Sequence, residues 1–152
     1  MEIQGHGMVD NKAMTACGHW MEIVGTISQN NNADFYKTVY AYTGAAIGMY
    51  DAFICCWFTK YKFDLIRPET YINKYINADW MPYLQTPPFP EYNSAHSTIS
   101  AAAATVLGTI YKSNTAFRYS SERELGWHDA SFQTSVKAPG EVSVKRFYGG
   151  VD

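Results

Sequence analysis

The sequence contains no run of basic residues that would direct it to a nucleic acid. Its 12 lysines and arginines are outnumbered by 14 aspartates and glutamates, which gives a formal net charge of −2. Proteins that bind nucleic acids carry basic patches that contact the phosphate backbone. We therefore expect no nucleic-acid partner.

Cysteine is also scarce. The three cysteines, Cys17, Cys55 and Cys56, do not have the spacing of a zinc site, and two adjacent cysteines rarely bridge each other. They do not indicate whether the protein works in an oxidising or a reducing compartment. We expect no divalent metal ion.

The first fourteen residues lack the basic start and the apolar centre of a secretory signal. The protein is therefore expected to be cytoplasmic, or else to be exported by a segment outside this chain. The rest of the sequence has no internal repeat and no low-complexity segment. We expect residues 1–14 to be a poorly defined N-terminal segment and residues 15–152 to form a single helical domain.

One apolar segment, residues 35–58, is long enough to span a bilayer, and Gly44 and Gly48 have the spacing of helix contacts in membranes. Asp51, Lys37 and several tyrosines distributed along the segment argue against a span, because charges are costly there and interfacial tyrosines gather at the ends. We therefore predict a buried helix of a soluble domain.

Patterns typical of strands are nearly absent, so the predicted fold class is all-α, a helical bundle. Apolar spacing predicts helices over about residues 15–28 and 35–65, and a third helix that starts at residue 95. Asp34 is placed to cap the second helix.

Two other parts of the chain are predicted to be irregular. Pro68 and the proline-rich stretch after it are expected to form an extended connection to the third helix. Residues 112–140 are polar and poorly periodic, which favours a long loop. Residues 141–152 fit either a helix or a short strand, and periodicity does not decide between them.

The stretch "PPFPEYNSAHSTISAAAATVL" contains a junction between an extended segment and a helix. Three prolines within residues 87–90 enforce extended backbone, and the helix that starts at Ala95 has Asn93 or Ser94 as its N-cap. The start of a helix offers unpaired N–H groups to an anion, and the Ser94 hydroxyl and the His96 imidazole add donors. Taken alone, the pattern is better explained by an ordinary cap and an ordinary histidine.

A second group of donors occurs in "KYKFDLIRPET". Lys60 and Arg67 are seven residues apart, close to two helical turns, and would lie on nearly the same face. Pro68 forces Arg67 out of helical backbone, so its guanidinium would point off the helix end. An ammonium and a planar guanidinium together suit a tetrahedral oxyanion. The alternative is a solvated helix end in which Lys62 and Asp64 pair locally.

In chain order, the sequence contains Lys-x6-Arg-Pro from Lys60, Ser-Ala-His from Ser94, and Arg146 followed closely by Gly149 and Gly150. This order resembles the superfamily that joins vanadium-dependent haloperoxidases with type 2 phosphatidic acid phosphatases and bacterial acid phosphatases. The segments "LIRPETYINKYI", "LQTPPFPEY" and "RFYGGV" look most like the soluble bacterial haloperoxidase branch. The resemblance extends from about His19 to the last residue and implies an all-α bundle.

The resemblance also implies a site. Lys60, Arg67 and Arg146 would bind the equatorial oxygens of vanadate or phosphate, assisted by the Ser94 hydroxyl and the Ala95 amide. Positive charges held in place at this site would then bind the oxyanion without a divalent metal ion.

His96 would be the acid–base histidine. Four positions depart from the family pattern. Asn93 replaces a proline, Ala95 replaces a glycine and Lys145 replaces a serine. Asp152 stands where the family has the histidine that attacks phosphorus or bonds vanadium, and an aspartate there would add negative charge beside an anion.

Two further predictions concern the surroundings of the site. Asp51, inside an apolar helix, is expected either to hold an arginine of the site in place or to form a plain buried ion pair. The aromatic residues Trp57, Phe58 and Phe89 are expected to pack in the core rather than to line a substrate pocket.

Three functions follow from the resemblance. The first is a vanadate-bearing enzyme that oxidises halide with hydrogen peroxide, and the second is a phosphomonoesterase that needs no cofactor. The third is an inactive oxyanion-binding remnant, which Asp152 favours. The expected partners are a small-molecule substrate and inorganic vanadate or phosphate. We expect a homo-oligomer or missing chain segments to cover exposed apolar surface, because the family domain is longer and the chain resembles a fragment. The family is commonly periplasmic or secreted.

Overall fold

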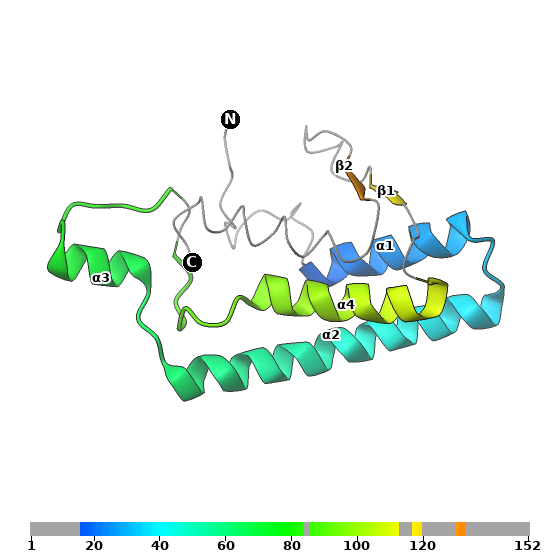
Figure 1. Ribbon diagram of the computed structural model, residues 1–152, viewed down its shortest axis with the longest axis horizontal. Helices are drawn as coiled ribbons and strands as arrows, with labels where there is room; N and C mark the ends of the chain where they lie inside the picture. The colour runs from blue at the N-terminus through cyan, green and yellow to red at the C-terminus, as the bar shows by residue number, and fades with distance from the viewer. Residues whose placement is uncertain (1–15, 84–85, 113–116, 120–129, 133–152) are drawn as a thin grey trace.

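The computed structural model describes residues 16–83, 86–112, 117–119 and 130–132. This part of the chain is mainly helical, as predicted, and it contains one pair of short strands (Figure 1). The elements in chain order are α1 (Ala16–Asn30), α2 (Phe35–Phe63), α3 (Pro68–Tyr75), α4 (Ala95–Tyr111), β1 (Phe117–Tyr119) and β2 (Ala130–Phe132). The all-α fold class is therefore confirmed.

Three of the helices, α1, α2 and α4, lie side by side in one bundle (Figure 1). α1 and α4 run in the same direction. α2 begins at the turn after α1, runs the opposite way and ends before α3. α3 lies beyond the end of this bundle, and the chain returns from it to the start of α4. The long helix α2 therefore packs against the alanine-rich helix α4 in the bundle that the sequence predicts.

The ends of α2 follow from its local sequence. The Asp34 side chain accepts a hydrogen bond of 2.8 Å from the Lys37 backbone N–H, so Asp34 is the N-cap that the sequence predicts. The helix stops after Phe63 because Asp64 takes a left-handed conformation with φ of 46°. α2 therefore ends about two residues earlier than expected.

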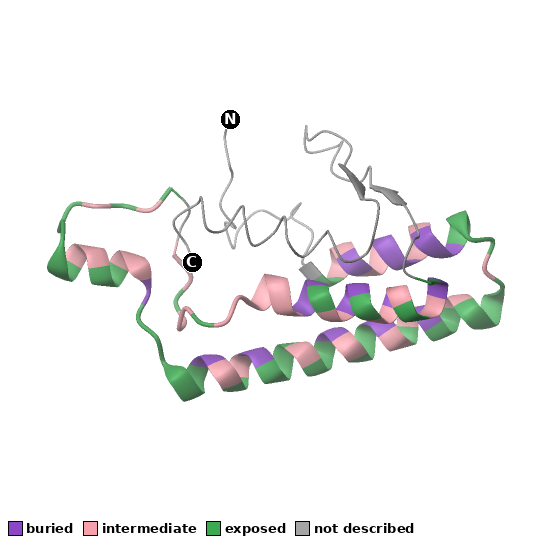
Figure 2. Cartoon of the chain, viewed as in Figure 1, coloured by how far each residue is buried: buried purple, intermediate pink, exposed green. Residues whose placement is uncertain are grey.

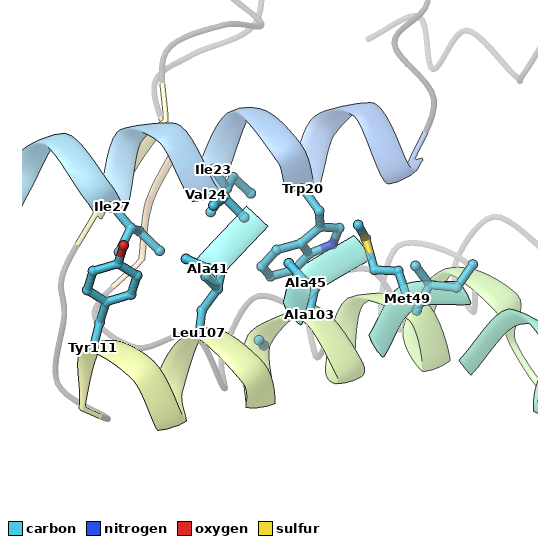
Figure 3. Packing of buried hydrophobic residues seen from close by; sticks show 12 residues of the cluster. Trp20, Ile23, Val24, Ile27, Ala41, Ala45, Met49, Ala103, Leu107 and Tyr111 are labelled. Carbon is cyan, nitrogen blue, oxygen red and sulfur yellow. The ribbon is translucent and has the colours of Figure 1, made fainter. Parts of the chain in front are cut away.

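The core lies between α1, α2 and α4 (Figure 3). Two buried polar pairs cross it from α1 to α4. Trp20 Nε1 donates to Ser100 Oγ at 2.9 Å, and the Ser28 and Tyr111 hydroxyls are 2.7 Å apart. These bonds satisfy polar groups that would otherwise be costly to bury. The apolar residues of the core are Trp20, Ile23, Val24, Ile27, Ala41, Ala45, Met49, Ile99, Ala103, Ala104, Leu107 and Tyr111.

α2 has one buried face and one exposed face, so the prediction of a buried helix is only half right. The side that meets α1 and α4 is buried, and the opposite side is exposed along the length of the helix (Figure 2). None of the helices in the described ranges is long and apolar enough to cross a membrane.

Two regions differ from the expected irregular structure. Residues Pro68–Tyr75 form α3, because a proline is tolerated at the first position of a helix, where its missing N–H costs nothing. Within the expected long loop, β1 and β2 pair antiparallel, with Arg118 opposite Ser131. The rest of residues 113–152, and all of residues 1–15, lie outside the described part of the chain.

Gly48 lies at the close approach of α2 to α4, where a Cβ atom would be 3.0 Å from a methyl group of Val106. We expect Gly48→Leu to reduce the free energy of unfolding by about 2 kcal/mol, because extra side-chain volume forces two packed helices apart. Urea denaturation measures this change. Ala46→Leu on an exposed part of the same helix is the control, and an equal loss in both variants would show that the close approach is not the cause.

Candidate functional site

Lys60 lies in the last turn of α2 and is fully buried, with 0% of its surface exposed. Its Nζ donates to the backbone carbonyls of Pro90 and Glu91, each at 2.8 Å. A buried ammonium requires such acceptors, because its desolvation is otherwise costly. Lys60 therefore ties the end of α2 to the segment that leads into α4.

Arg67, which follows the end of α2 in the chain, contacts the same segment before α4 as Lys60 does. Its Nε donates to the Phe89 carbonyl at 2.7 Å, and one Nη donates to the Pro90 carbonyl at 3.2 Å. Arg67 is buried and has extended backbone, as the proline after it predicts. The two cations do not share a helix face, because α2 ends before Arg67. They converge because both bind the Pro90 carbonyl.

The Phe89 ring lies beside both cationic groups. The Lys60 Nζ and the Arg67 guanidinium carbon are each 5.1 Å from the centre of this ring, within the range of a cation–π contact. The centre of the Trp57 ring lies 5.3 Å from the centre of the Phe89 ring. The Trp57 ring also stacks on the Phe53 ring, with 4.2 Å between the ring centres. These aromatic side chains hold the segment against α2. Half-buried Trp57 and Phe89 thus form a boundary cluster rather than part of the main core.

Phe58 does not belong to this cluster. Its side chain is 68% exposed, so the expectation that it packs in the core is wrong for the described part of the chain. The reason is its position, which faces away from α1 and α4.

The start of α4 is built as the sequence predicts, with Ser94 rather than Asn93 as the N-cap. The Ser94 hydroxyl accepts from the Ser97 backbone N–H at 3.4 Å and from the Ser97 hydroxyl at 3.1 Å. Asn93 instead donates to the Thr98 hydroxyl at 3.0 Å. Ala95 and His96 are half-buried in the first turn. The helix N-terminus thus directly follows the segment that the two cations hold.

Asn93 also carries a buried side-chain acceptor. Its Oδ1 has no hydrogen-bond partner within the described residues. A protonated oxyanion carries an O–H group that could donate to such an acceptor. The start of α4 therefore offers an acceptor beside its donors.

Cys56 joins the two parts of this region, and nothing in the sequence distinguished it as part of the site. Its Sγ lies 3.6 Å from the Asn93 carbonyl and donates to it. Burial raises the pKa of the Cys56 thiol above its ordinary value, although Lys60 and a hydrogen bond with Thr98 act in the opposite direction. Cys56 is therefore a neutral thiol at neutral pH.

We expect Cys56 to react with a thiol reagent about tenfold or more slowly than exposed Cys55 at pH 7, because the thiolate is the reacting form. Rates in Cys55→Ser and Cys56→Ser variants that also carry Cys17→Ser separate the two sites, because exposed Cys17 would otherwise react as well. Because the folded state raises this pKa, the thiol stabilises the fold at pH values below the ordinary thiol pKa, and its contribution is lost as the pH rises through the raised pKa. Equal rates at the two cysteines would contradict the burial of Cys56.

The other predicted site residues are not brought into this region by the described part of the structure. Asp51 is exposed on α2. Water solvates an exposed carboxylate, so the predicted buried ion pair of Asp51 is wrong. The other predicted role of Asp51, orienting an arginine of the site, stays a prediction. Lys145, Arg146 and Asp152 lie outside the described residues, so their predicted roles also stay predictions.

Comparison with known proteins gives the family. The chain matches the VCPO second helical-bundle domain, of vanadium chloroperoxidase, over residues 40–79 and 73–151. It is also similar to a solved structure described as the first bacterial vanadium-dependent iodoperoxidase, with 45% identity and a TM-score of 0.86. No curated protein matches it.

The fold is thus all-α, and the chain belongs to the family of the vanadium chloroperoxidase second helical-bundle domain. The match covers 94% of this chain but only 35% of the iodoperoxidase chain. The chain therefore spans about a third of that related protein.

Proposed function

We propose that this chain supplies the oxyanion-binding part of a vanadium-dependent haloperoxidase, whose reaction is the oxidation of halide by hydrogen peroxide. The observation that carries the proposal is the convergence of buried Lys60 and Arg67 on the segment directly before the N-terminus of α4. Membership of the haloperoxidase family supports it.

The chemistry of these residues fits vanadate. Lys60 offers a point charge and Arg67 a planar fork of donors, and oxyanions bind to both types. The backbone carbonyls of Phe89, Pro90 and Glu91 accept hydrogen bonds from these residues, and the contacts orient both cations. An oxyanion would also gain from the positive end of the α4 dipole and from the N-terminal amides.

Each residue has a proposed role at this site. Lys60, Arg67 and Arg146 would bind the oxygens of vanadate, with the Ser94 hydroxyl and the Ala95 amide as further donors. When bound, vanadate supplies the Lewis acid that activates hydrogen peroxide. His96 would donate or accept the proton that accompanies this chemistry. Ala95 keeps the amide donor, and its methyl group narrows the space before the helix.

The halide that we propose is iodide, because the related solved structure is described as an iodoperoxidase. A phosphate ester would present the same tetrahedral oxygens to Lys60 and Arg67, so phosphatase activity is the alternative outcome of the test. The family of the matched domain favours the haloperoxidase.

Titration of the unmodified chain with vanadate, followed by vanadium NMR or calorimetry, tests the proposal. We expect saturable binding at one site, displacement by phosphate, and no requirement for a divalent cation. Binding that does not saturate would contradict it. Hydrolysis of a phosphate monoester without oxidation of iodide would favour the phosphatase.

A further inference from the structure

The exposed side of α2 carries a row of large side chains, interrupted only at Thr43, which we call the outer stripe. Successive residues of a helix are about 100° apart, and on this basis the stripe occupies an arc of only about 80°. Its centre lies about 180° from the centre of the buried face of the same helix. The outer stripe consists of Tyr36, Tyr40, Ile47, Tyr50, Ile54, Phe58 and Tyr61, all of which are exposed.

A helix with two apolar faces is typical of the interior of a larger bundle. The lower edge of α2 in Figure 2 is exposed along its length and faces away from α1 and α4. Members of the stripe are three, four or seven residues apart, which is the spacing that packs against another helix. Scattered apolar residues on a surface need no partner, whereas large exposed side chains gathered along one face of a helix mark an interaction site.

One edge of the outer stripe is polar. Lys37, Asp51 and Lys62 all lie on the same flank of α2, about 60° to 100° from the centre of the stripe by the same spacing, and all three are exposed. An apolar centre with a charged margin is the usual composition of a protein interface. Asp51, which has no buried environment in this chain, then belongs to the margin of a docking surface.

We propose that the outer stripe is the docking surface for a helix from the part of a haloperoxidase that this chain does not span. The chain covers 35% of the related iodoperoxidase, and its family is described as the second helical bundle of its protein. A further helical bundle therefore belongs to the same kind of protein and could supply the helix.

A second copy of this chain is a poorer occupant. Packed helices place small residues opposite large ones, and the outer stripe consists of large side chains except at Thr43, which lies within its arc. Two copies would oppose large residues to large residues. A different helix, with small residues at the facing positions, fits the stripe better.

A chimera tests the proposal. The full chain replaces the matched third of the bacterial vanadium-dependent iodoperoxidase, and Ile54→Glu is compared with Cys55→Glu in the chimera and in the isolated chain. Ile54 belongs to the stripe, whereas Cys55 is exposed on the polar flank beside it. We expect Ile54→Glu to lower the melting temperature of the chimera by several degrees and to leave the isolated chain unchanged.

Cys55→Glu should change neither protein. Ile47→Glu, a second stripe variant, should behave as Ile54→Glu does. Equal melting temperatures for the Ile54 and Cys55 variants of the chimera would overturn the proposal. So would a dimer of the isolated chain, detected by sedimentation, that Ile54→Glu dissociates and Cys55→Glu does not. The readout is thermal, so it is independent of vanadate binding and halide oxidation.

Discussion

Arg67→Ala is expected to weaken vanadate binding by the chain at least about tenfold. A hydrogen bond to a charged group contributes about 1.5–3 kcal/mol, and about 1.4 kcal/mol corresponds to a factor of ten in affinity. Arg67 is buried and its Nε and Nη groups already face the Phe89 and Pro90 carbonyls. Its loss removes a charge and also loosens the segment that sets the start of α4.

Two further variants separate these effects. Lys62→Ala removes a charge from the exposed flank of α2, and we expect little change in affinity because solvent screens that charge. Arg67→Lys keeps the charge but loses the planar fork, and we expect an intermediate affinity. Circular dichroism checks that each variant remains helical. Equal losses for Arg67→Ala and Lys62→Ala would mean that general positive charge, rather than a site, attracts the anion.

The sequence predicted the parts of the fold that local chemistry controls. Asp34 and Ser94 cap α2 and α4 as expected, because a short polar side chain before an apolar periodic run satisfies the first N–H groups of a helix. The sequence does not predict α3, because a proline breaks a helix at most positions, whereas Pro68 occupies the first position of this helix. Strands of three residues, such as β1 and β2, are too short to have a visible period.

The sequence indicates which residues approach each other at the candidate site, but not the contacts that bring them together. Lys60 and Arg67 do come together, but through the Pro90 carbonyl and not through a shared helix face. Backbone acceptors have no signature in the sequence, because every residue has a carbonyl. The place of Cys56 between the two halves of the site was missed for a similar reason, since only tertiary packing brings its thiol to the Asn93 carbonyl.

Asp152→His is expected to raise the rate of iodide oxidation by roughly a hundredfold or more in the chimera, because it restores the histidine that the family pattern places there. A neutral imidazole nitrogen can bond the central atom of an oxyanion without adding negative charge to the site. A carboxylate repels the anion, and most strongly where water is excluded. With Asp152 unchanged, we therefore expect negligible haloperoxidase activity, with weak anion binding retained through Lys60 and Arg67.

Asp152→Asn is the matched control, because it removes the negative charge without supplying an imidazole. We expect Asp152→Asn to bind vanadate more tightly than the unmodified protein and to remain inactive. If Asp152→Asn were as active as Asp152→His, charge repulsion alone would limit the unmodified protein and the imidazole would be dispensable. If the unmodified chimera were active, and Asp152→Ala abolished that activity, the aspartate itself would be the functional group. Rates of iodide oxidation at saturating hydrogen peroxide, with vanadate affinities measured in parallel, separate the loss of binding from the loss of chemistry.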